Sequence, residues 1–571
     1  MSNRSGKLKC LKCLYSNVDQ LLNKIDDLES MISEDAPDIM LFTEVIPKAQ
    51  RNAINESQIN IPGYDLYTNF DFTEENLGAS GKRGVAVYVK VDIKSEKIVL
   101  SNDYDDQMWV EIRLRGEDKL LCGCIYRSPS KDKEKTIGTT SKVCQILNEA
   151  VQRKNTHVLI CGDFNYPEIK WENEYVLEQT PVIGPFISTV QSLHLHQHII
   201  RPTRYRYGQE PSLLDLVFTN EEEMLTNLIH NPAVGESDHE CLRFDLDCYK
   251  KELKKTMLPN YYKGDYAAIR NRLKDVDWLA NLDGNFQSDY SNFLKKLETS
   301  ITGCIPCRKN DKKRKSIFFT REAIRLRDLK CKLWRRYLNT KTRYTHSRYV
   351  KVKNELRSLT RKLRFDFEKK IAENLKTAPK QFWAYVKSRT KTRGRIPTLK
   401  NKDNSLANTP SKKAEALNNF FTSVFTKEDL TNIPSSQNNT FNGEDLDTFQ
   451  ITKEMVQKKI QELNPGKTPG PDGWHPVFLK NIGDLIALPL SIIFQKSLDE
   501  GILPRDWLKA CVTAIFKKGE KSLPENYRPV SITSIICKLM ESIVRDKLVA
   551  HMVNNNLFSK NNMDSFLGET V

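Results

Sequence analysis

Residues 156–165 read THVLICGDFN, an apolar run that ends abruptly in polar residues. The apolar part is short and β-branched, which is typical of a buried strand. Asp163 and Asn165 come directly after it and flank Phe164. Side chains two positions apart in an extended chain point to the same face. The stretch therefore predicts a strand whose end carries a carboxylate and an amide side by side.

Four other short signatures within the first 245 residues have the same form. They are SNVD at 16–19, FTE at 42–44, IY at 125–126 and SDH at 237–239. An acidic residue at a strand end is most often a solvated cap, but these five occur together and in order. Their carboxylates, amides, phenol and imidazole suffice to bind a hard cation, position a water and neutralise a phosphate. The set predicts a metal-dependent phosphodiesterase, with DNA cleavage as the leading hypothesis.

Predicted strands and helices alternate between residues 7 and 245. Helical spacing of apolar residues covers Gln20–Ser33, and a second helix is predicted over Thr140–Arg153. The predicted strands are 11–17, 37–44, 83–90, 106–114, 120–126, 156–165, 212–220 and 241–246. This alternation favours a layered α/β sandwich in one domain.

A chain of 571 residues is too long for one core and is expected to form about three or four units. We place them at 1–247, 248–445 and 446–571. The middle part is helical and basic from about 320 to 393, with a further helix over Ser411–Phe425 and then a polar linker. The chain has no run of 18 uncharged apolar residues, so no membrane partner is expected.

The positive charge of the chain is concentrated in one segment. The formal net charge is +16, yet residues 301–400 alone hold 32 Lys and Arg against 7 Asp and Glu. Such a concentration indicates a polyanionic partner, of which nucleic acid is the obvious one. The alternative is that these helices pack their charges against the protein itself. CIPCRKNDKKRKS, residues 304–316, also resembles a nuclear-localisation cluster.

The cysteines and the N-terminus bear on the compartment. Thirteen cysteines are scattered without a second CxxC partner for Cys10/Cys13 or Cys304/Cys307, so a four-ligand zinc site is not expected. The first ten residues contain no apolar signal core. We expect reduced thiols in a protein that is synthesised in the cytoplasm, is not secreted and acts in the nucleus.

Two longer stretches carry a family resemblance. GDFNYPEIKWE, and IIRPTRYRYGQEPSLLDLVFTNEEEMLTNL followed by GESDHE, resemble the apurinic-type endonuclease domain of non-LTR (LINE-type) retrotransposons. That domain belongs to the endonuclease/exonuclease/phosphatase superfamily. The resemblance covers residues 7–245 and implies a four-layer α/β sandwich with the active site at one mouth of two sheets.

The resemblance also implies a metal site. Glu44 would be the principal Mg²⁺ ligand, helped by Asn17, Asp19 or Asp238, and Mn²⁺ would be a substitute. Oxygen donors of this kind suit hard divalent cations.

Catalytic roles follow from the same matched motifs. Asp163 would orient or deprotonate the attacking water, and Asn165 would hold the water and the phosphate. His239 would donate to a phosphate oxygen, with Asp215 fixing its tautomer, and Tyr126 would contact the phosphate or the leaving oxygen. Hydrogen-bond donors such as His239 and Tyr126 stabilise the negative charge that develops on the phosphate oxygens.

The remaining substrate contacts are expected at two places. Thr203 and Ser212 are expected to touch the DNA backbone. From about residue 446, the stretches ELNPGKTPGPDGWHPVFLK and NYRPVSITSIICKLMESIV resemble the fingers at the start of a reverse transcriptase. In that family Lys517 or Lys518, and Arg528, would lie near the triphosphate of the incoming nucleotide, although NYRP also suits an ordinary turn before a helix.

The palm motifs of that polymerase, FxDxxxAFD-like and YxDD, do not occur in the sequence. We therefore expect an Mg²⁺-dependent DNA endonuclease of a non-LTR retrotransposon, nicking target DNA to leave a 3′-hydroxyl for target-primed reverse transcription, without polymerase activity in this chain. The element's RNA is the expected partner of segment 301–400. The alternatives are an abasic-site repair nuclease or phosphatase of the same superfamily, and a non-catalytic nucleic-acid-binding remnant.

Overall fold

The computed structural model divides the chain into two compact units. One unit comprises residues 1–254 and 312–394, and the other comprises 255–311 and 395–571. The boundaries expected from the sequence, after 247 and after 445, stay predictions. The residues described are 10–33, 36–72, 75, 81–100, 104–171, 180–249, 257–278, 280, 285–309, 316–390, 396–401, 403–407, 409–425, 446, 449–555 and 557. The predicted linker at 426–445 and the core of the basic cluster at 310–315 lie outside these residues.

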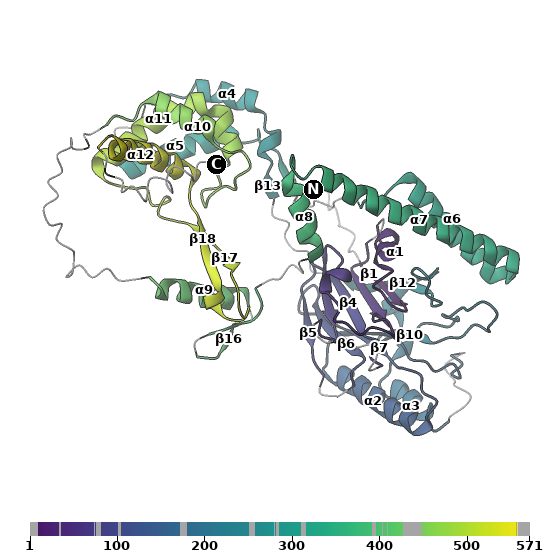
Figure 1. The fold of residues 1–571 in the computed structure, drawn as a ribbon. Helices are drawn as coiled ribbons and strands as arrows, with labels where there is room; N and C mark the ends of the chain where they lie inside the picture. The colour runs from purple at the N-terminus through teal and green to yellow at the C-terminus, as the bar shows by residue number, and fades with distance from the viewer. Residues whose placement is uncertain are drawn as a thin grey trace, which may run out of the picture. The chain divides into compact units, whose positions relative to one another are not determined.

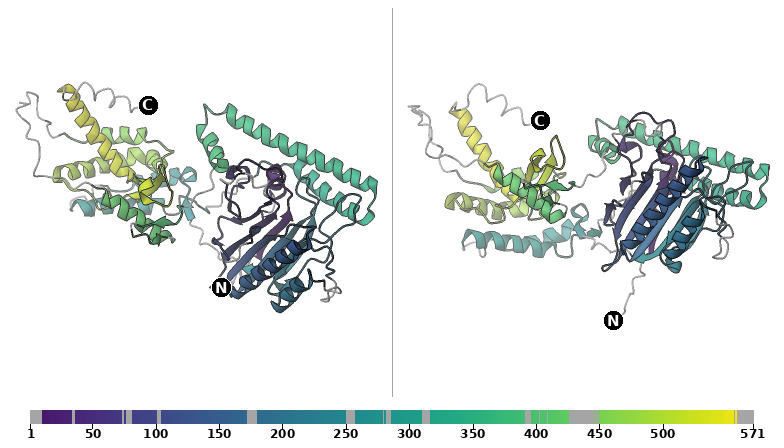
Figure 2. Two further views of the ribbon diagram at one scale, coloured as in Figure 1. Left: turned by 60° about the horizontal axis from the view of Figure 1, so that its bottom comes forward. Right: turned by 90° about the horizontal axis from the view of Figure 1, so that it is seen from below.

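Two mixed six-stranded sheets form the centre of the first unit (Figures 1 and 2). The first sheet has the order β11 (Leu225–Asn231), β12 (Cys241–Tyr249), β1 (Cys10–Asn17), β2 (Ile39–Thr43), β4 (Val85–Lys90) and β3 (Tyr64–Thr68). The second has the order β5 (Ser95–Ile98), β6 (Gln107–Arg113), β7 (Lys119–Tyr126), β8 (His157–Asp163), β10 (Asp215–Thr219) and β9 (His196–Gln197).

The eight predicted strands are the eight inner strands of these sheets, and all are confirmed. The four that the sequence did not predict, β3, β5, β9 and β11, are the four sheet edges. Inner strands such as β2 and β8 are buried almost throughout, whereas β5 and β11 are largely exposed or half-buried. An exposed edge strand lacks the continuous apolar run that marks a buried one.

Three apolar layers hold the sandwich together. The inner faces of the sheets meet in a core that contains Tyr15, Leu41, Val110, Cys161 and Val217. The other face of the second sheet packs on α2 (Lys133–Gln152) and α3 (Gly184–Ser192), and that of the first sheet packs on α1 (Ile25–Met31) and the loops beside it. Helices thus cover two stacked sheets, which confirms the predicted four-layer α/β sandwich.

The basic helices after residue 320 belong to the same unit. They are α6 (Arg321–Thr340), α7 (Arg343–Glu373) and α8 (Pro379–Thr390), and α7 packs across α1 (Figure 1). The hydroxyls of Thr320 and Thr342 cap the first two helices. Leu326, Leu333 and Trp334 face Tyr349 and Val352 in a small core between α6 and α7.

Helices dominate the second unit. Its core joins α4 (Tyr266–Lys274), α5 (Phe286–Ile301), α10 (Lys453–Glu462), α11 (Pro476–Glu500) and α12 (Ile535–Asn554). By length and composition alone, α11 is apolar enough to cross a membrane, but 67% of its most apolar window is buried inside the protein. The predicted helix over Ser411–Phe425 is observed as α9 (Pro410–Ser423). Short strand pairs complete the unit: β13 (Met257–Pro259) with β14 (Cys307–Lys309), β15 (Leu399–Lys400) with β16 (Leu406–Ala407), and β17 (Cys511–Phe516) with β18 (Tyr527–Ile532).

Candidate functional site

The strand register brings the predicted signatures to one mouth of the two sheets. In the first sheet Asn17 pairs with Thr43, the residue before Glu44. In the second sheet Asp163 lies between Tyr126 on β7 and Asp215 on β10. The loop that carries the last signature closes the group, because the Ser237 hydroxyl donates to the Asn17 carbonyl at 2.7 Å. Signatures far apart in sequence therefore meet at a single site.

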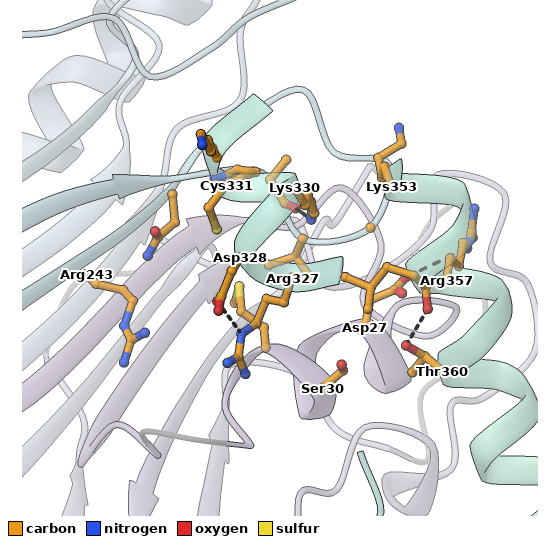
Figure 3. Close-up of a pocket in the computed structure, with 18 of the residues that line it drawn as sticks. Asp27, Ser30, Arg243, Arg327, Asp328, Lys330, Cys331, Lys353, Arg357 and Thr360 are labelled. Carbon is orange, nitrogen blue, oxygen red and sulfur yellow. Dashed lines mark hydrogen bonds and ion pairs between the residues drawn. The ribbon is translucent and has the colours of Figure 1, made fainter. Parts of the chain in front are cut away.

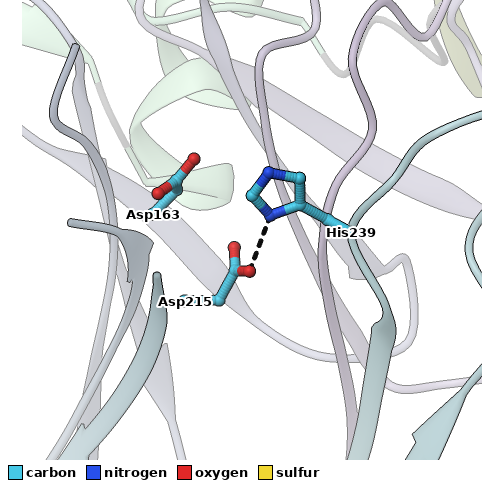
Figure 4. A group of neighbouring side chains, drawn as sticks. All are labelled: Asp163, Asp215 and His239. Atoms are coloured by element: carbon cyan, nitrogen blue, oxygen red, sulfur yellow. Dashed lines mark hydrogen bonds and ion pairs between the residues drawn. The ribbon is translucent and has the colours of Figure 1, made fainter. Parts of the chain in front are cut away.

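Asp163, Asp215 and His239 form the buried centre of this site (Figure 4). One oxygen of Asp215 lies 2.7 Å from Nδ1 of His239, and the other accepts a hydrogen bond from the Tyr15 hydroxyl at 2.7 Å. Both carboxylate oxygens of Asp215 are thus engaged, and the imidazole is held through Nδ1. This leaves Nε2 of His239 as the nitrogen that can face a substrate.

The burial of these groups changes their protonation. Burial and the neighbouring charge of Asp215 raise the pKa of Asp163 to about 8, although His239 opposes the shift. Burial disfavours the charged form of His239, but the carboxylate of Asp215 outweighs it and raises the histidine pKa to about 10. The pair therefore combines a carboxylate able to take up a proton near neutral pH with an imidazolium able to donate one.

Asn17 connects the two sheets across the mouth. Its amide nitrogen donates to Asp163 at 2.8 Å and to Glu44 at 3.1 Å. Glu44 therefore lies beside the central carboxylates, as its predicted role requires. Glu44, Asp19 and Asn165 all have positive φ angles, of 52°, 38° and 51°. Such backbone strain in non-glycine residues is concentrated at functional sites.

Arg83 is a site residue that the sequence motifs did not reveal. Its guanidinium, which is almost fully buried, pairs with Glu44 and donates to Asp19 at 2.9 Å. The register explains its position: Val85 pairs with Thr43, so the residues just before β4 lie beside those just after β2. The sequence did contain a signal for Arg83. It is a basic residue just before an apolar strand, and that strand lies beside the strand that ends at the acidic Glu44.

Tyr126 and Asn165 lie at the predicted place. Burial and the negative charges of Glu44 and Asp163 raise the pKa of Tyr126 far above its usual range, so its phenol stays a hydrogen-bond donor. The backbone amide of Asn165 donates to Asp163 at 3.3 Å, and its side chain donates to the Arg127 carbonyl at 2.7 Å. The roles predicted for both residues stay predictions.

Asp238, Thr203 and Ser212 surround the histidine. Asp238 pairs with Arg204 at 3.0 Å and lies 3.8 Å from Nε2 of His239. The Thr203 hydroxyl is fully buried and accepts the backbone N–H of Asp215 at 3.1 Å, so it supports the start of β10. Ser212 is partly exposed and bridges to Arg204 through its backbone. Their predicted contacts with metal or DNA stay predictions.

Lys517 and Arg528 lie in the second unit. Arg528 is opposite Ile515 in the β17–β18 hairpin, and Lys517 follows β17 with its N–H donating to the Asn526 carbonyl at 2.7 Å. Both side chains are exposed on this hairpin. Their predicted place near a nucleotide triphosphate stays a prediction.

The donor set fits a hard divalent cation. Asp163, Asp215 and His239 each offer one ligand atom, and these atoms lie within 4.8 Å of one another. Asp215 is committed to His239 and Tyr15, whereas the carboxylates of Asp163 and Glu44 retain lone pairs beyond those used in hydrogen bonds. Mg²⁺ and Mn²⁺ prefer such oxygen donors.

Comparisons with known proteins find similarities within the first unit. Residues 120–243 match the family model described as endonuclease-reverse transcriptase. Among solved structures, the endonuclease domain of TRAS1, a telomere-specific non-LTR retrotransposon, covers 42% of this chain and 98% of its own, at 15% identity and a TM-score of 0.31. An AP endonuclease from Archaeoglobus fulgidus covers 42% and 99%, at 15% identity and a TM-score of 0.32.

Curated relatives extend along almost the whole chain. The probable RNA-directed DNA polymerase from transposon BS of Drosophila melanogaster is 24% identical over 94% of this chain. The polymerase from mobile element jockey of Drosophila funebris is 22% identical over 92%. The chain spans 59% and 56% of the length of these relatives. The resemblance to retrotransposon polyproteins is thereby confirmed: almost the whole chain is similar to the polymerases of two mobile elements, and residues 120–243 match the endonuclease-reverse transcriptase model.

Proposed function

We propose that the first unit is an Mg²⁺-dependent DNA endonuclease of a non-LTR retrotransposon. It nicks one strand of target DNA and leaves a 3′-hydroxyl that primes reverse transcription. The observation that carries the proposal is the meeting of two hydrogen-bonded sets, Glu44–Asn17–Asp163 and Asp215–His239, at one mouth of the sheets. A base, an imidazolium and hard oxygen donors within one site are what hydrolysis of a phosphodiester requires.

Each side chain has a defined task in this reaction. Asp163 accepts the proton of the attacking water, for which its raised pKa is suited. The imidazolium of His239 donates from Nε2 to a non-bridging phosphate oxygen, where negative charge increases in the transition state. Asp215 fixes the ring and sustains its charge. Tyr126 stays protonated and donates to the phosphate or the leaving 3′ oxygen.

The metal has a place among these residues. Glu44 would hold the metal, with Asn17, Asp19 or Asp238 as further donors. Arg83 pairs with Glu44 and Asp19 and neutralises their charges without a metal. A divalent cation supplies positive charge to the phosphate oxygens when bound.

Replacing Glu44 by glutamine tests the metal site. We expect Glu44→Gln to abolish Mg²⁺-dependent nicking of supercoiled plasmid, because the neutral amide loses the charge that attracts the cation and retains only one of the two oxygens that accept hydrogen bonds from Asn17 and Arg83. Thermal unfolding gives a second readout: Mg²⁺ or Mn²⁺ should raise the melting temperature of the wild-type chain but not that of the variant. Glu117→Ala, at an exposed loop residue, is the control. Equal metal-induced shifts in Glu44→Gln would contradict this site.

The pH profile tests the pairing of Asp215 with His239. Nicking should increase with pH as Asp163, whose pKa is raised to about 8, loses its proton. It should decrease again as His239, whose pKa is raised to about 10, becomes neutral. Asp215→Asn removes the charge that raises both pKa values, so both limbs should move to lower pH, the upper one by more than about one unit toward the ordinary histidine value. Superimposable profiles would show that Asp215 does not act through His239.

The choice of substrate distinguishes the proposed retrotransposon endonuclease from a repair nuclease and from a phosphatase. A retrotransposon endonuclease should nick intact plasmid DNA, whereas a repair nuclease should require an abasic site and a phosphatase should release phosphate from small monoesters. We infer further that target DNA is bound in the nucleus and that the element's RNA contacts segment 301–400. Polymerase activity is not expected of this chain.

A further inference from the structure

The basic helices enclose a cavity where they dock on the nuclease sandwich. The cavity has a volume of about 540 Å³ and lies between α6, α7, α1 and the turn at 231–235 (Figure 3). Seven of its lining residues are Lys or Arg and two are Asp. Lys330 comes from α6, Lys353 from α7 and Asp27 from α1, so both parts of the unit are needed to form it.

Docking contacts account for only some of these cations. Arg357 pairs with Glu236 and lies 3.8 Å from Asp27, and Arg327 lies 3.8 Å from Asp328. These contacts attach α7 to the sandwich or join neighbours on α6. Within the described part of the chain, Lys353, Lys332 and Arg335 form no ion pair although they line the same cavity. The excess positive charge is therefore not needed to hold the helices in place.

Burial acts against the charged forms of two lysines that line the cavity. Burial lowers the pKa of Lys353, Glu236 and Asp27 oppose this shift, and the charge of Arg357 adds to it. Burial likewise lowers the pKa of Lys330, and Lys353 is among the charges that add to the shift. The Nε of Arg357 is buried and has no hydrogen-bond partner in the described residues. An anion that entered the cavity would relieve the repulsion and satisfy this donor.

Phosphate is the anion that this set of donors suits. Guanidinium groups bind phosphate oxygens in pairs and ammonium groups bind them as point charges. The volume falls within the range of about 300–1,000 Å³ that is typical of sites for ligands larger than a bare ion. We propose that the cavity between α6, α7 and α1 is a phosphate-binding site that holds the sugar–phosphate backbone of a nucleic-acid strand. The residues that line the cavity indicate a phosphate ligand. The assignment of that phosphate to a nucleic acid rests on the proposed function.

Direct binding measurements with the full chain test the site without cleavage. Fluorescence anisotropy in EDTA would compare a labelled single-stranded 12-mer DNA, the same sequence as RNA, and displacement by inorganic phosphate. Lys353→Met should weaken binding of the 12-mers by at least about tenfold and lower the slope of log K against log salt by about 0.7, the value for one lost phosphate contact on a single strand. Lys351→Met, two residues earlier on α7 and exposed outside the cavity, should change affinity less than about twofold.

Thermal unfolding separates a binding role from a structural one. Lys353→Met removes a charge that burial disfavours, so its melting temperature without nucleic acid should equal or exceed that of the wild type. Unchanged affinity for both 12-mers would overturn the proposal, as would equal losses in Lys353→Met and Lys351→Met. If inorganic phosphate is bound but neither 12-mer depends on Lys353, the nucleic-acid assignment is wrong. Plasmid nicking by the wild type, measured separately with Mg²⁺, shows whether the nuclease proposal itself fails.

Discussion

Asp163→Asn is expected to lower the rate of plasmid nicking by about 10²–10⁴-fold, the usual contribution of a positioned general base. Asparagine has the same shape and can still accept the hydrogen bond of the Asn17 amide. It cannot accept a proton from water. It also removes one of two carboxylates that lie side by side in the sheet, so the protein should fold at least as stably.

Single-turnover nicking at saturating Mg²⁺ measures this effect apart from binding. Asp118→Asn, at an exposed residue between β6 and β7, is the matched control and should retain wild-type activity. A melting temperature equal to or above that of the wild type would show that the loss arises in the chemistry. A nicking rate within about threefold of the wild type would remove Asp163 from the role of base.

Glu29→Ala is expected to destabilise the first unit by about 3–5 kcal/mol, because it removes a carboxylate that two largely buried arginines share. Glu29, on α1, accepts two hydrogen bonds from Arg389, at 2.9 and 3.1 Å, and pairs with Arg364. The three side chains are only 10–20% exposed. Asp26 remains 2.7 Å from Arg364 and compensates one charge in part.

Urea unfolding of the full chain measures this loss. Glu355→Ala is the control, since Glu355 is exposed on α7 and forms no ion pair in the described part of the chain. The control should unfold within about 0.5 kcal/mol of the wild type, as surface changes usually do. An effect equally small in Glu29→Ala would mean that α7 and α8 are not anchored through Glu29.

The sequence predicted the inner strands of the two sheets but not their edge strands. Strands such as 37–44 and 156–165 are apolar because both faces of an inner strand are buried. The edge strands β5 and β11 alternate weakly, because much of each strand is exposed or half-buried, although each pairs with the next strand of the chain. Short edge strands therefore gave no pattern to detect.

The sequence predicted those site residues that lie next to the ends of apolar strands. Glu44 and Asp163 each follow an apolar run, His239 lies just before the strand that begins at Cys241, and the register brings the three together. Arg83 and Tyr15 were not predicted, because their roles depend on which strands are neighbours. Val85 opposite Thr43 places Arg83 beside Glu44, and the facing of the two sheets places Tyr15 against Asp215.

The basic segment shows how tertiary contacts can change the reading of a charge pattern. Helices were predicted over 320–393 from the spacing of apolar residues, and the described part of this range, up to residue 390, confirms them. The pattern could not say where their cations point. Arg364 and Arg389 face the sandwich, whereas Lys353, Lys332 and Arg335 line a cavity. The two interpretations of the charge, packing and binding of a polyanion, therefore concern different residues of the same helices.

The central claim is that this strand-end site cleaves one strand of DNA, and the most direct test is conversion of supercoiled plasmid to open circles by the full chain with Mg²⁺. We predict nicked circles whose ends are extended by an added DNA polymerase, which requires a 3′-hydroxyl, and almost none with His239→Ala. Nicking that persists unchanged in His239→Ala, or no nicking by the wild type, would contradict the account.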